Sequence, residues 1–317
     1  MSEPISAVIC TLNEEQNIGP CILSVKDADE VIVADDGSTD GTVAIAQALG
    51  AKVIRRSDWS VRTTLDDYGA FHDRFGWWPS FKVGDRIRNG HLESREAVSF
   101  AANDWVVMPD ADERVSWDLP LLRKLIDKVG PDQIEHEYVH VHNPDGSPVS
   151  VGHSMKMYRR SKTVIDGRVH GVIIPTKVAG VDFMRIDHWQ KPGHSQSYVL
   201  PILEYCVLTD DDQRSRFYLG RELYYYHQYD RALKLLNLYL TDATGFMPEI
   251  QKARIYEARC YWETGRGDEA RATAQNALLL NPEDPEAMHL MGDVFAEPWS
   301  HKWHRLATVA NGEDALW

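Results

Sequence analysis

The fold of this chain is decided by the stretch Val31-Ile-Val-Ala-Asp35-Asp36-Gly37-Ser38-Thr39-Asp40-Gly41-Thr42. Four apolar residues lead directly into two carboxylates and a turn, and the helix-favouring residues 42–49 follow. This order is typical of a buried parallel strand that ends at a polar site and continues into a helix. Because ligands of open α/β sheets bind outside the carboxyl ends of the strands, we expect Asp35 and Asp36 at a binding site. A turn or a helix cap is the alternative role for such carboxylates, and it suits Asp40 best.

A second segment repeats this arrangement further along the chain, where Trp105-Val-Val-Met-Pro109 is followed by Asp110-Ala-Asp112-Glu113. In an extended segment, residues i and i+2 face the same side, so Asp110 and Asp112 can together hold a hard divalent cation. A solvated acidic turn is the alternative, because short acidic triplets are common. Two strands that each end in carboxylates predict a pocket for an anion held through a metal, or for a nucleotide sugar.

Composition restricts the class of protein. The 317 residues, 43% of them hydrophobic, are enough for about two domains with a sizeable core. The formal net charge of -14 disfavours nonspecific binding of nucleic acid, although a local basic patch remains compatible with it. The four cysteines form no Cys-x-x-Cys pair, which fits a reducing, cytoplasmic compartment. The sequence shows no signal peptide and no apolar run of the about 18 residues that a transmembrane helix needs.

The first part of the chain alternates strands and helices. Strands are predicted at 4–10, 30–34 and 51–55, and helices at 17–25 and 42–49. This succession is the signature of a parallel, doubly wound sheet.

The aromatic-rich residues 57–90 interrupt this rhythm, and we interpret them as a long loop or insertion over the ligand edge of the sheet. Their Trp77-Trp78 pair is either a platform for sugar stacking or a hydrophobic anchor of the loop. Further on, residues 93–102 and 118–129 are predicted helices, and residues 138–158 a β-hairpin.

From about residue 198 the chain is predicted to be helical, and this tail contains a repeat. Tyr229-Asp-Arg-Ala232 and Gly267-Asp-Glu-Ala270 fall in matching places, and Asn281-Pro282 follows. The small, aromatic and turn positions resemble the tetratricopeptide repeat. Such helices either bind a protein or an acceptor, or merely pack on the first domain, since repeats bury their own stacking faces first.

Four motifs occur in order in the first part of the chain: Cys10-Thr11-Leu12-Asn13-Glu14-Glu15-Gln16-Asn17-Ile18, residues 34–42, Ser94-Arg95-Glu96-Ala97, and residues 104–113. Together they resemble the family 2 glycosyltransferases with the GT-A fold, and most of all the lipopolysaccharide-core β-glucosyltransferase-like and repeat-fused branch. The resemblance covers about residues 4–190. The predicted fold class is therefore an α/β GT-A domain with a Rossmann-like, mostly parallel sheet over residues 1–200, followed by an all-α tetratricopeptide-like domain over residues 201–317.

The resemblance implies an inverting hexosyltransferase that uses a nucleotide sugar, a UDP-sugar above all, and an acceptor hydroxyl on a glycan, glycolipid or protein. It implies that Thr11, Asn13 and Glu14 line the nucleotide pocket. Asp35 and Asp36 would then contact the base and the ribose of the donor.

The resemblance also implies a divalent metal, manganese or magnesium, held by Asp110, Asp112 and His170, with Asp112 taking part in catalysis. Arg95 would contact the donor, although this chain has Arg95-Glu96 where the family often shows Arg-Asn. The family branch often carries His-Glu where this chain keeps His170 and lacks the glutamate. His188 lies in the same stretch and is read either as a ligand or as a structural histidine.

The catalytic base is predicted from the alternation of side chains along the strand near residue 138. One set contains two valines and is expected to face the core: Glu135, Glu137, Val139 and Val141. The other set is expected to face the cleft, with one histidine added from the partner strand: His136, His140, His142 and His153. We therefore expect a histidine base from His153, His136 and His140, with His153 slightly ahead.

Other functions remain open. The acceptor can be a protein or peptide held by the repeats, or a modified base of nucleic acid, against which the acidic charge argues. A catalytically inactive GT-A scaffold that acts through its repeats is the alternative from another class, and the presence of both acidic motifs disfavours it.

Overall fold

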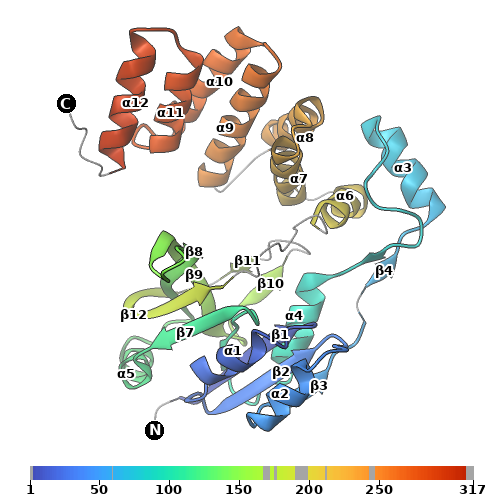
Figure 1. The fold of residues 1–317 in the computed structure, drawn as a ribbon, viewed down its shortest axis with the longest axis vertical. Helices are drawn as coiled ribbons and strands as arrows, with labels where there is room; N and C mark the ends of the chain where they lie inside the picture. Colours follow the sequence, from blue (N-terminus) through green and yellow to red (C-terminus); the bar gives the residue numbers. More distant parts are fainter. Residues whose placement is uncertain are drawn as a thin grey trace. The chain divides into compact units, whose positions relative to one another are not determined.

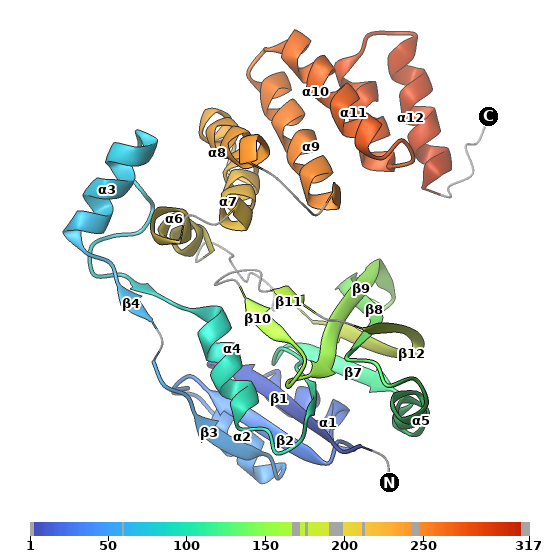
Figure 2. The same cartoon turned by 180° about the vertical axis from the view of Figure 1, so that it is seen from behind.

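The structure is a computed structural model that describes residues 3–58, 60–166, 172–174, 177–189, 199–210, 213–242 and 247–311. The chain divides into two compact units. One unit comprises Met1–Val61 and Arg88–Ser195, and the other comprises Arg62–Ile87 and Gln196–Trp317. Figures 1 and 2 show the elements of each unit from opposite sides.

The described residues of the first unit form an eight-stranded sheet in the order β3-β2-β1-β6-β9-β8-β12-β7. The strands in this order are Lys52–Arg55, Glu30–Asp35, Ile5–Thr11, Trp105–Val107, Pro148–Arg159, Gln133–His142, Val178–His188 and Glu113–Trp117. The pairs from β3 to β6 are all parallel, and β12 is parallel to β8, whereas the pairs β6–β9, β9–β8 and β12–β7 are antiparallel. The predicted α/β class with a mostly parallel sheet is confirmed.

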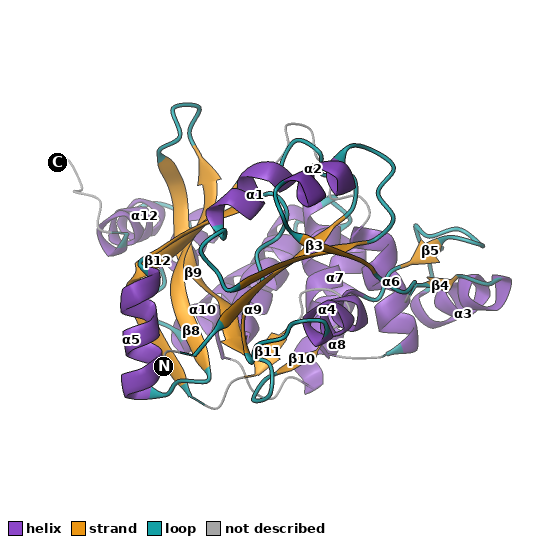
Figure 3. Cartoon of the chain, turned by 90° about the horizontal axis from the view of Figure 1, so that it is seen from below, coloured by secondary structure: helices purple, strands orange, loops and turns teal. Residues whose placement is uncertain are grey.

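Strand β1 lies in the middle of the parallel part and is buried on both faces. Ile5 and Ile9 pack in the core that also contains residues of α1 (Ile18–Ser24), α2 (Thr42–Ala48) and α5 (Leu119–Val129). Val8 points to the other face, against α4 (Gly90–Ser99). Figure 3 shows α1 and α2 on one side of the parallel part of the sheet and α4 on the other. Burial of both faces explains why this strand reads as a continuous apolar run.

The carboxyl ends of the central strands meet at one edge of the sheet. In the parallel register Thr11 lies opposite Asp35, and an isolated parallel bridge joins Cys10 to Asp110. The two acidic segments, which are far apart in the sequence, therefore follow the two strands that flank β1. This is the arrangement expected from the strand-end motifs.

Strands β8 and β9 form the predicted hairpin, which is longer than the sequence suggested. The predicted placement of His136 in the cleft is wrong. Ile134, His136 and Val139 are all buried, while Val141 is exposed. Glu135 and Glu137, which were expected on the core face, are only half-buried, and the pairing of β8 with β9 is irregular after Ile134 and after Val139. The position of the valines consequently does not identify a core face.

The second unit is helical after residue 199, as predicted. Its helices are α6 Val199–Thr209, α7 Gln213–Tyr225, α8 Tyr229–Asp242, α9 Met247–Glu263, α10 Gly267–Leu280, α11 Pro285–Val294 and α12 Trp299–Ala310. The repeat positions Ala232 and Ala270 are both fully buried. Gly220 of α7 lies against Leu236 of α8, where a β-carbon would come within 2.8 Å of that side chain. In the part of the chain that the structure describes, no helix is long and apolar enough to cross a membrane.

Residues 62–87 form an insertion that packs within the helical unit, which the sequence did not indicate. They contain the helix α3 (Leu65–Phe75) and the short strand β5 (Arg86–Ile87), which pairs with β4 (Val61–Arg62), rather than only a loop. The division at residue 200 stays a prediction, and the compact units place this insertion with the helices.

Contacts to α6 and α8 hold this insertion. The buried Glu204 of α6 accepts a hydrogen bond from the backbone N–H of Ser80 at 2.6 Å, and Arg74 donates to the carbonyl of Val207 at 3.1 Å. Trp77 is buried beneath cations from α8, whereas Trp78 is exposed and stacks on Tyr68. Trp77 therefore fits the reading as a hydrophobic anchor.

Glu204 makes the stability of the helical unit depend on pH. Burial raises the pKa of Glu204 from 4.5 to about 7. Between these values the unfolded chain releases the proton and the folded chain keeps it, so this contribution is complete below pH 4.5 and is lost as the pH rises to 7. We expect the wild-type protein to lose about 2–3 kcal/mol of unfolding free energy over this range relative to Glu204→Gln. Urea unfolding of both proteins across the range measures this difference, and parallel pH profiles would contradict it.

Candidate active site

The first acidic segment is held by turns. The buried Asp35 accepts hydrogen bonds from the backbone N–H groups of Gly37 at 2.9 Å and Ser38 at 3.1 Å. Asp40 accepts from the backbone N–H of Thr42 at 3.0 Å, at the start of α2. Asp40 has the predicted turn or cap role, and Asp35 has a turn role as well. Asp36 is therefore the carboxylate of this segment that is left for other partners.

Asp36 belongs to a buried cluster of four charges. Arg88 lies 3.1 Å from the Asp36 carboxylate and 2.6 Å from Glu93, and Arg56 lies 4.0 Å and 3.8 Å from the same two carboxylates. Asp36, Arg56 and Glu93 are buried, whereas the Arg88 side chain is 38% exposed. Arg88 is thus the member of the cluster that a ligand can reach.

Sequence reasoning missed Arg56, Arg88 and Glu93 as site residues. Arg56 directly follows the strand β3, and Arg88 and Glu93 lie just before and within the first turn of α4. The rule that selected Asp36, a charge at the carboxyl end of a parallel strand, would also have selected Arg56.

The predicted nucleotide-pocket residues connect the loop after β1 to the loop after β2. The side-chain oxygen of Asn13 accepts from the backbone N–H of Thr39 at 2.8 Å, and the backbone N–H of Glu14 donates to the hydroxyl of Thr42 at 2.8 Å. Thr11 is buried at the end of β1. These residues come together with the Asp36 cluster at the same sheet edge, because Asp36 donates its backbone N–H to the carbonyl of Thr11.

The second acidic segment engages partners from three other strands. Asp110 lies 2.6 Å from the ammonium of Lys156 on β9. Asp112 lies 3.2 Å from Nε2 of His188 on β12, and this hydrogen bond raises the pKa of His188. Glu113 is buried and accepts from the hydroxyl of Tyr138 on β8 at 2.5 Å. Lys156 and Tyr138 carry no sequence signal, because they lie in strands whose register with the acidic segment cannot be deduced from spacing.

The predicted histidine bases have different surroundings. His136 is completely buried, and its Nε2 accepts from the backbone N–H of Lys156 at 3.3 Å. Burial lowers the pKa of His136 to about 4, so this side chain is a neutral core group and does not face a cleft. His140 is exposed and its ring centroid lies 4.7 Å from that of Tyr138.

The two remaining histidines of this group also differ. His142 bonds to Asp187 at 2.9 Å and stacks on Trp189, while His153 is exposed and lies opposite Glu137 in the hairpin. The predicted ligand His170 lies outside the described residues.

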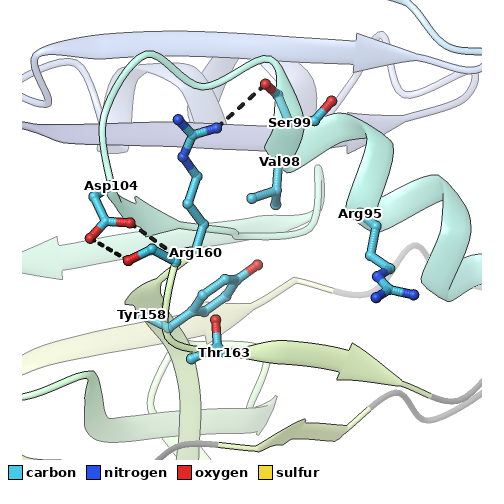
Figure 4. Close-up of a pocket in the computed structure, with 8 residues that line it drawn as sticks. Arg95, Val98, Ser99, Asp104, Tyr158, Arg160 and Thr163 are labelled. Atoms are coloured by element: carbon cyan, nitrogen blue, oxygen red, sulfur yellow. Dashed lines mark hydrogen bonds between the residues drawn. The ribbon is translucent and has the colours of Figure 1, made fainter.

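Arg95 lies beside a different hollow. This hollow has a volume of about 450 Å³ and is lined by Arg95, Val98, Ser99, Asp104, Tyr158, Arg160, Ser161 and Thr163 (Figure 4). Asp104 precedes β6, whereas Asp110 follows it. The hollow is therefore at the opposite end of β6 from the acidic segment, and the structure does not bring Arg95 to the other predicted donor contacts.

Comparison with known proteins gives two family matches. Residues 6–60 match the model of "Glycosyl transferase family 2", and residues 223–294 match a "Tetratricopeptide repeat" model. One segment of the chain is thus similar to the family 2 glycosyltransferases and another to tetratricopeptide repeats. The resemblance drawn from the sequence motifs is thereby confirmed.

Individual relatives are similar over parts of the chain. A glycosyltransferase of Rickettsia felis, named as uncharacterized, is 40% identical over 118 residues, which are 37% of this chain and 31% of the relative. The lipopolysaccharide core biosynthesis glycosyltransferase LpsC of Rhizobium meliloti is 26% identical over 228 residues, which are 68% of this chain and 75% of LpsC. The chain spans about a third of the length of the first curated relatives it matches.

Among solved structures, glucosyl-3-phosphoglycerate synthase from Mycobacterium tuberculosis, in complex with Mn²⁺, UDP and glucosyl-3-phosphoglycerate, aligns with a TM-score of 0.38. The identity is 18%, and the alignment covers 66% of this chain and 80% of the synthase.

The sheet edge of the first unit offers two side chains that fit as ligands of a divalent metal. Over the described ranges, no group of three or more histidine, cysteine, aspartate or glutamate side chains could bind a metal by itself. Asp112 Oδ2 and His188 Nε2, however, lie 3.2 Å apart, and both side chains are partly exposed. One carboxylate and one imidazole suit manganese or a similar ion, and leave coordination positions for phosphate oxygens and water.

The burial of His136 predicts a structural role for this residue. We expect His136→Ala to lower the free energy of unfolding by about 2–4 kcal/mol, because a buried ring and its hydrogen bonds are lost. The exposed His153→Ala in the same hairpin is the control and should change stability by less than about 0.5 kcal/mol. Urea unfolding of the two variants measures both free energies of unfolding. Equal free energies of unfolding for His136→Ala and His153→Ala would contradict the burial of His136.

Proposed function

We propose that the glycosyltransferase domain transfers a hexose from a nucleoside diphosphate sugar, with UDP as the nucleotide, to a hydroxyl of a glycan or glycolipid, with inversion. The observation that carries this proposal is the meeting of the two acidic segments at one sheet edge through the Cys10–Asp110 bridge. The family match to residues 6–60 covers the first of these segments. A cytoplasmic location belongs to the same proposal and is supported by the four cysteines, all free thiols within the described ranges.

The donor is proposed to bind between the loop that contains Asp36 and the segment that contains Asp112. Asp36 is held in place by two guanidinium groups, and its carboxylate can accept a hydrogen bond from a base or ribose. The partly exposed Arg88 offers a cation to an anionic ligand at the same place. Both features favour a nucleotide rather than a neutral sugar.

Asp112 and His188 are proposed to hold a divalent metal together with the diphosphate of the donor. When bound, such an ion neutralises the charge that develops on the leaving nucleoside diphosphate. The backbone of this chain would fix the position of the ion. The backbone N–H of Trp189 donates a hydrogen bond to the backbone carbonyl of Asp112 at 2.8 Å, and His188 is held as the last residue of β12.

His140 is the base that the surroundings favour, ahead of His153. Its ring lies beside Tyr138, whose hydroxyl binds Glu113 of the acidic segment. Although the side chain of His140 is exposed, partial desolvation of its ring, and then the nearby His188, lower its pKa, which favours the neutral imidazole that can take the proton of an acceptor hydroxyl. The absence of a side chain at Gly152 leaves room, since a β-carbon there would lie 3.1 Å from His140 Nε2.

A protein acceptor is the second candidate, and one observation favours it. Three aromatic side chains on or just after α7 and on α9 of the repeats are exposed, namely Tyr225, Tyr226 and Trp262. Exposed aromatic residues are common in surfaces that bind proteins. In this alternative the helical unit holds the polypeptide and the donor site is unchanged.

The activity is tested with a panel of nucleotide sugars in the presence of manganese or of a chelator. We expect hydrolysis of a UDP-hexose that is abolished by the chelator and lowered at least about 100-fold in Asp112→Ala and in His188→Ala, because an interaction with the leaving group is lost. Asp182→Ala, which removes an exposed carboxylate from the same strand β12, is the control and should keep full activity. Failure of every nucleotide sugar to be hydrolysed by the wild-type protein would refute the proposal.

The base is tested by comparing His140→Ala with His153→Ala. We expect His140→Ala to lower turnover by about 10²–10⁴-fold without a change in UDP affinity, because proton transfer contributes that much. His153→Ala should retain turnover. Steady-state kinetics combined with calorimetric titration of UDP separates the two effects, and the reverse pattern would restore His153 as the base.

A further inference from the structure

An ammonium group lies inside the acidic segment. Nζ of Lys156 is 2.6 Å from Asp110 Oδ2 and 2.5 Å from Glu113 Oε1. The Glu113 side chain is 1% exposed, whereas that of Asp110 is 66% exposed. Lys156 therefore bridges a carboxylate of the core and a carboxylate at the surface.

The position of this ammonium is built into the sheet. Glu113 uses both oxygens, since Oε1 also accepts from the hydroxyl of Tyr138 and Oε2 accepts from the backbone N–H of Asp110 at 2.8 Å. The carbonyl of Lys156 accepts from the backbone N–H of Met108 at 2.8 Å, so β9 is fixed directly beside the acidic segment. The Lys156 ammonium also lies over the ring of Tyr138, 5.6 Å from its centroid.

The two aspartates of the segment are consequently not equivalent. Asp112 pairs with His188, an imidazole that can bind a metal in its neutral form. Asp110 pairs with Lys156, which has no lone pair to offer while protonated and repels any cation that approaches the same oxygen. A divalent ion that joins Asp112 and His188 displaces at most a proton from the imidazole, whereas at Asp110 it has to displace the whole Lys156 ammonium.

We propose that Lys156 is a specificity-determining residue that keeps Asp110 out of the metal site and restricts the metal to Asp112, His188 and the phosphates of the donor. This inference rests on the metal-dependent transfer proposed above and deepens it. It follows that the bare ion binds weakly and that the nucleotide has to bring the remaining ligands. The affinity of carboxylate sites for such ions rises with the number of anionic ligands, so removal of the ammonium should strengthen binding of the metal alone.

The test is titration of the full chain with Mn²⁺ alone, followed by the electron paramagnetic resonance signal of the free ion. We expect Lys156→Met to bind Mn²⁺ at least tenfold more tightly than the wild-type protein, and Lys156→Arg, which keeps the charge, to bind as the wild type does. Lys177→Met is the matched control, because Lys177 also donates through Nζ, but to the carbonyl of Val129. Equal affinity of Lys156→Met and the wild type would overturn the proposal.

Two double variants make the result decisive. Lys156→Met leaves the buried Glu113 without its cation and can fail to fold for that reason. Lys156→Met with Glu113→Gln removes the buried charge as well and should show the same gain in affinity. Lys156→Met with Asp110→Asn should return to wild-type affinity. A gain that survives Asp110→Asn would show a general charge effect and overturn the assignment to Asp110.

The outcome is independent of turnover. A wild-type protein that hydrolyses no nucleotide sugar, together with a Lys156→Met variant that gains Mn²⁺, would refute the proposed function and keep the role of Lys156. A wild-type protein that hydrolyses a nucleotide sugar, together with a Lys156→Met variant that gains no Mn²⁺, would refute the role of Lys156 alone.

Discussion

The parallel pairing of β1 with β2 on one side and with β6 on the other is the constraint on which the candidate site depends. Because β1 is buried on both faces, its register cannot slip without exposing apolar side chains. This register places Asp36 and Asp110 after the two strands that flank β1, although the two residues are far apart in the sequence. The chemistry of the site is therefore a consequence of how the buried strand β1 pairs with its two neighbours.

Three acidic side chains at this edge that are not used by a turn have a cationic or imidazole partner. Asp36 has Arg88 and Arg56, Asp110 has Lys156, and Asp112 has His188. Partly buried carboxylates need such partners, because an unpaired charge is costly away from water. In a chain with a net charge of -14, these partners decide which carboxylates remain open to a metal or a nucleotide.

The sequence predicted the features that depend on local patterns. Apolar runs followed by acidic turns indicated the strands, their succession along the chain and both acidic segments. The small-residue pattern around Ala232 and Ala270 indicated the repeat helices. It did not predict features that depend on pairing between distant segments. Lys156 reaches Asp110 only through the antiparallel register of β9 with β6. The placement of His136 failed because burial along β8 does not follow the two valines: His136 and Val139 are both buried, while Val141 is exposed.

The acidic segment shows where a local rule stops. The sequence treats residues 110–113 as extended, but they form a turn in which the backbone N–H of Glu113 donates to the carbonyl of Asp110 at 2.9 Å. Ala111 and Glu113 are buried, whereas the side chains of Asp110 and Asp112 are 66% and 27% exposed. The two exposed carboxylates do not have a shared partner. Asp110 is bridged to β1 and lies beside β9, whereas Asp112 adjoins the start of β7, whose pairing with β12 sets His188 opposite Glu113. Two carboxylates that the sequence presents as one metal motif are thus divided between a lysine and a histidine by the strands that flank them.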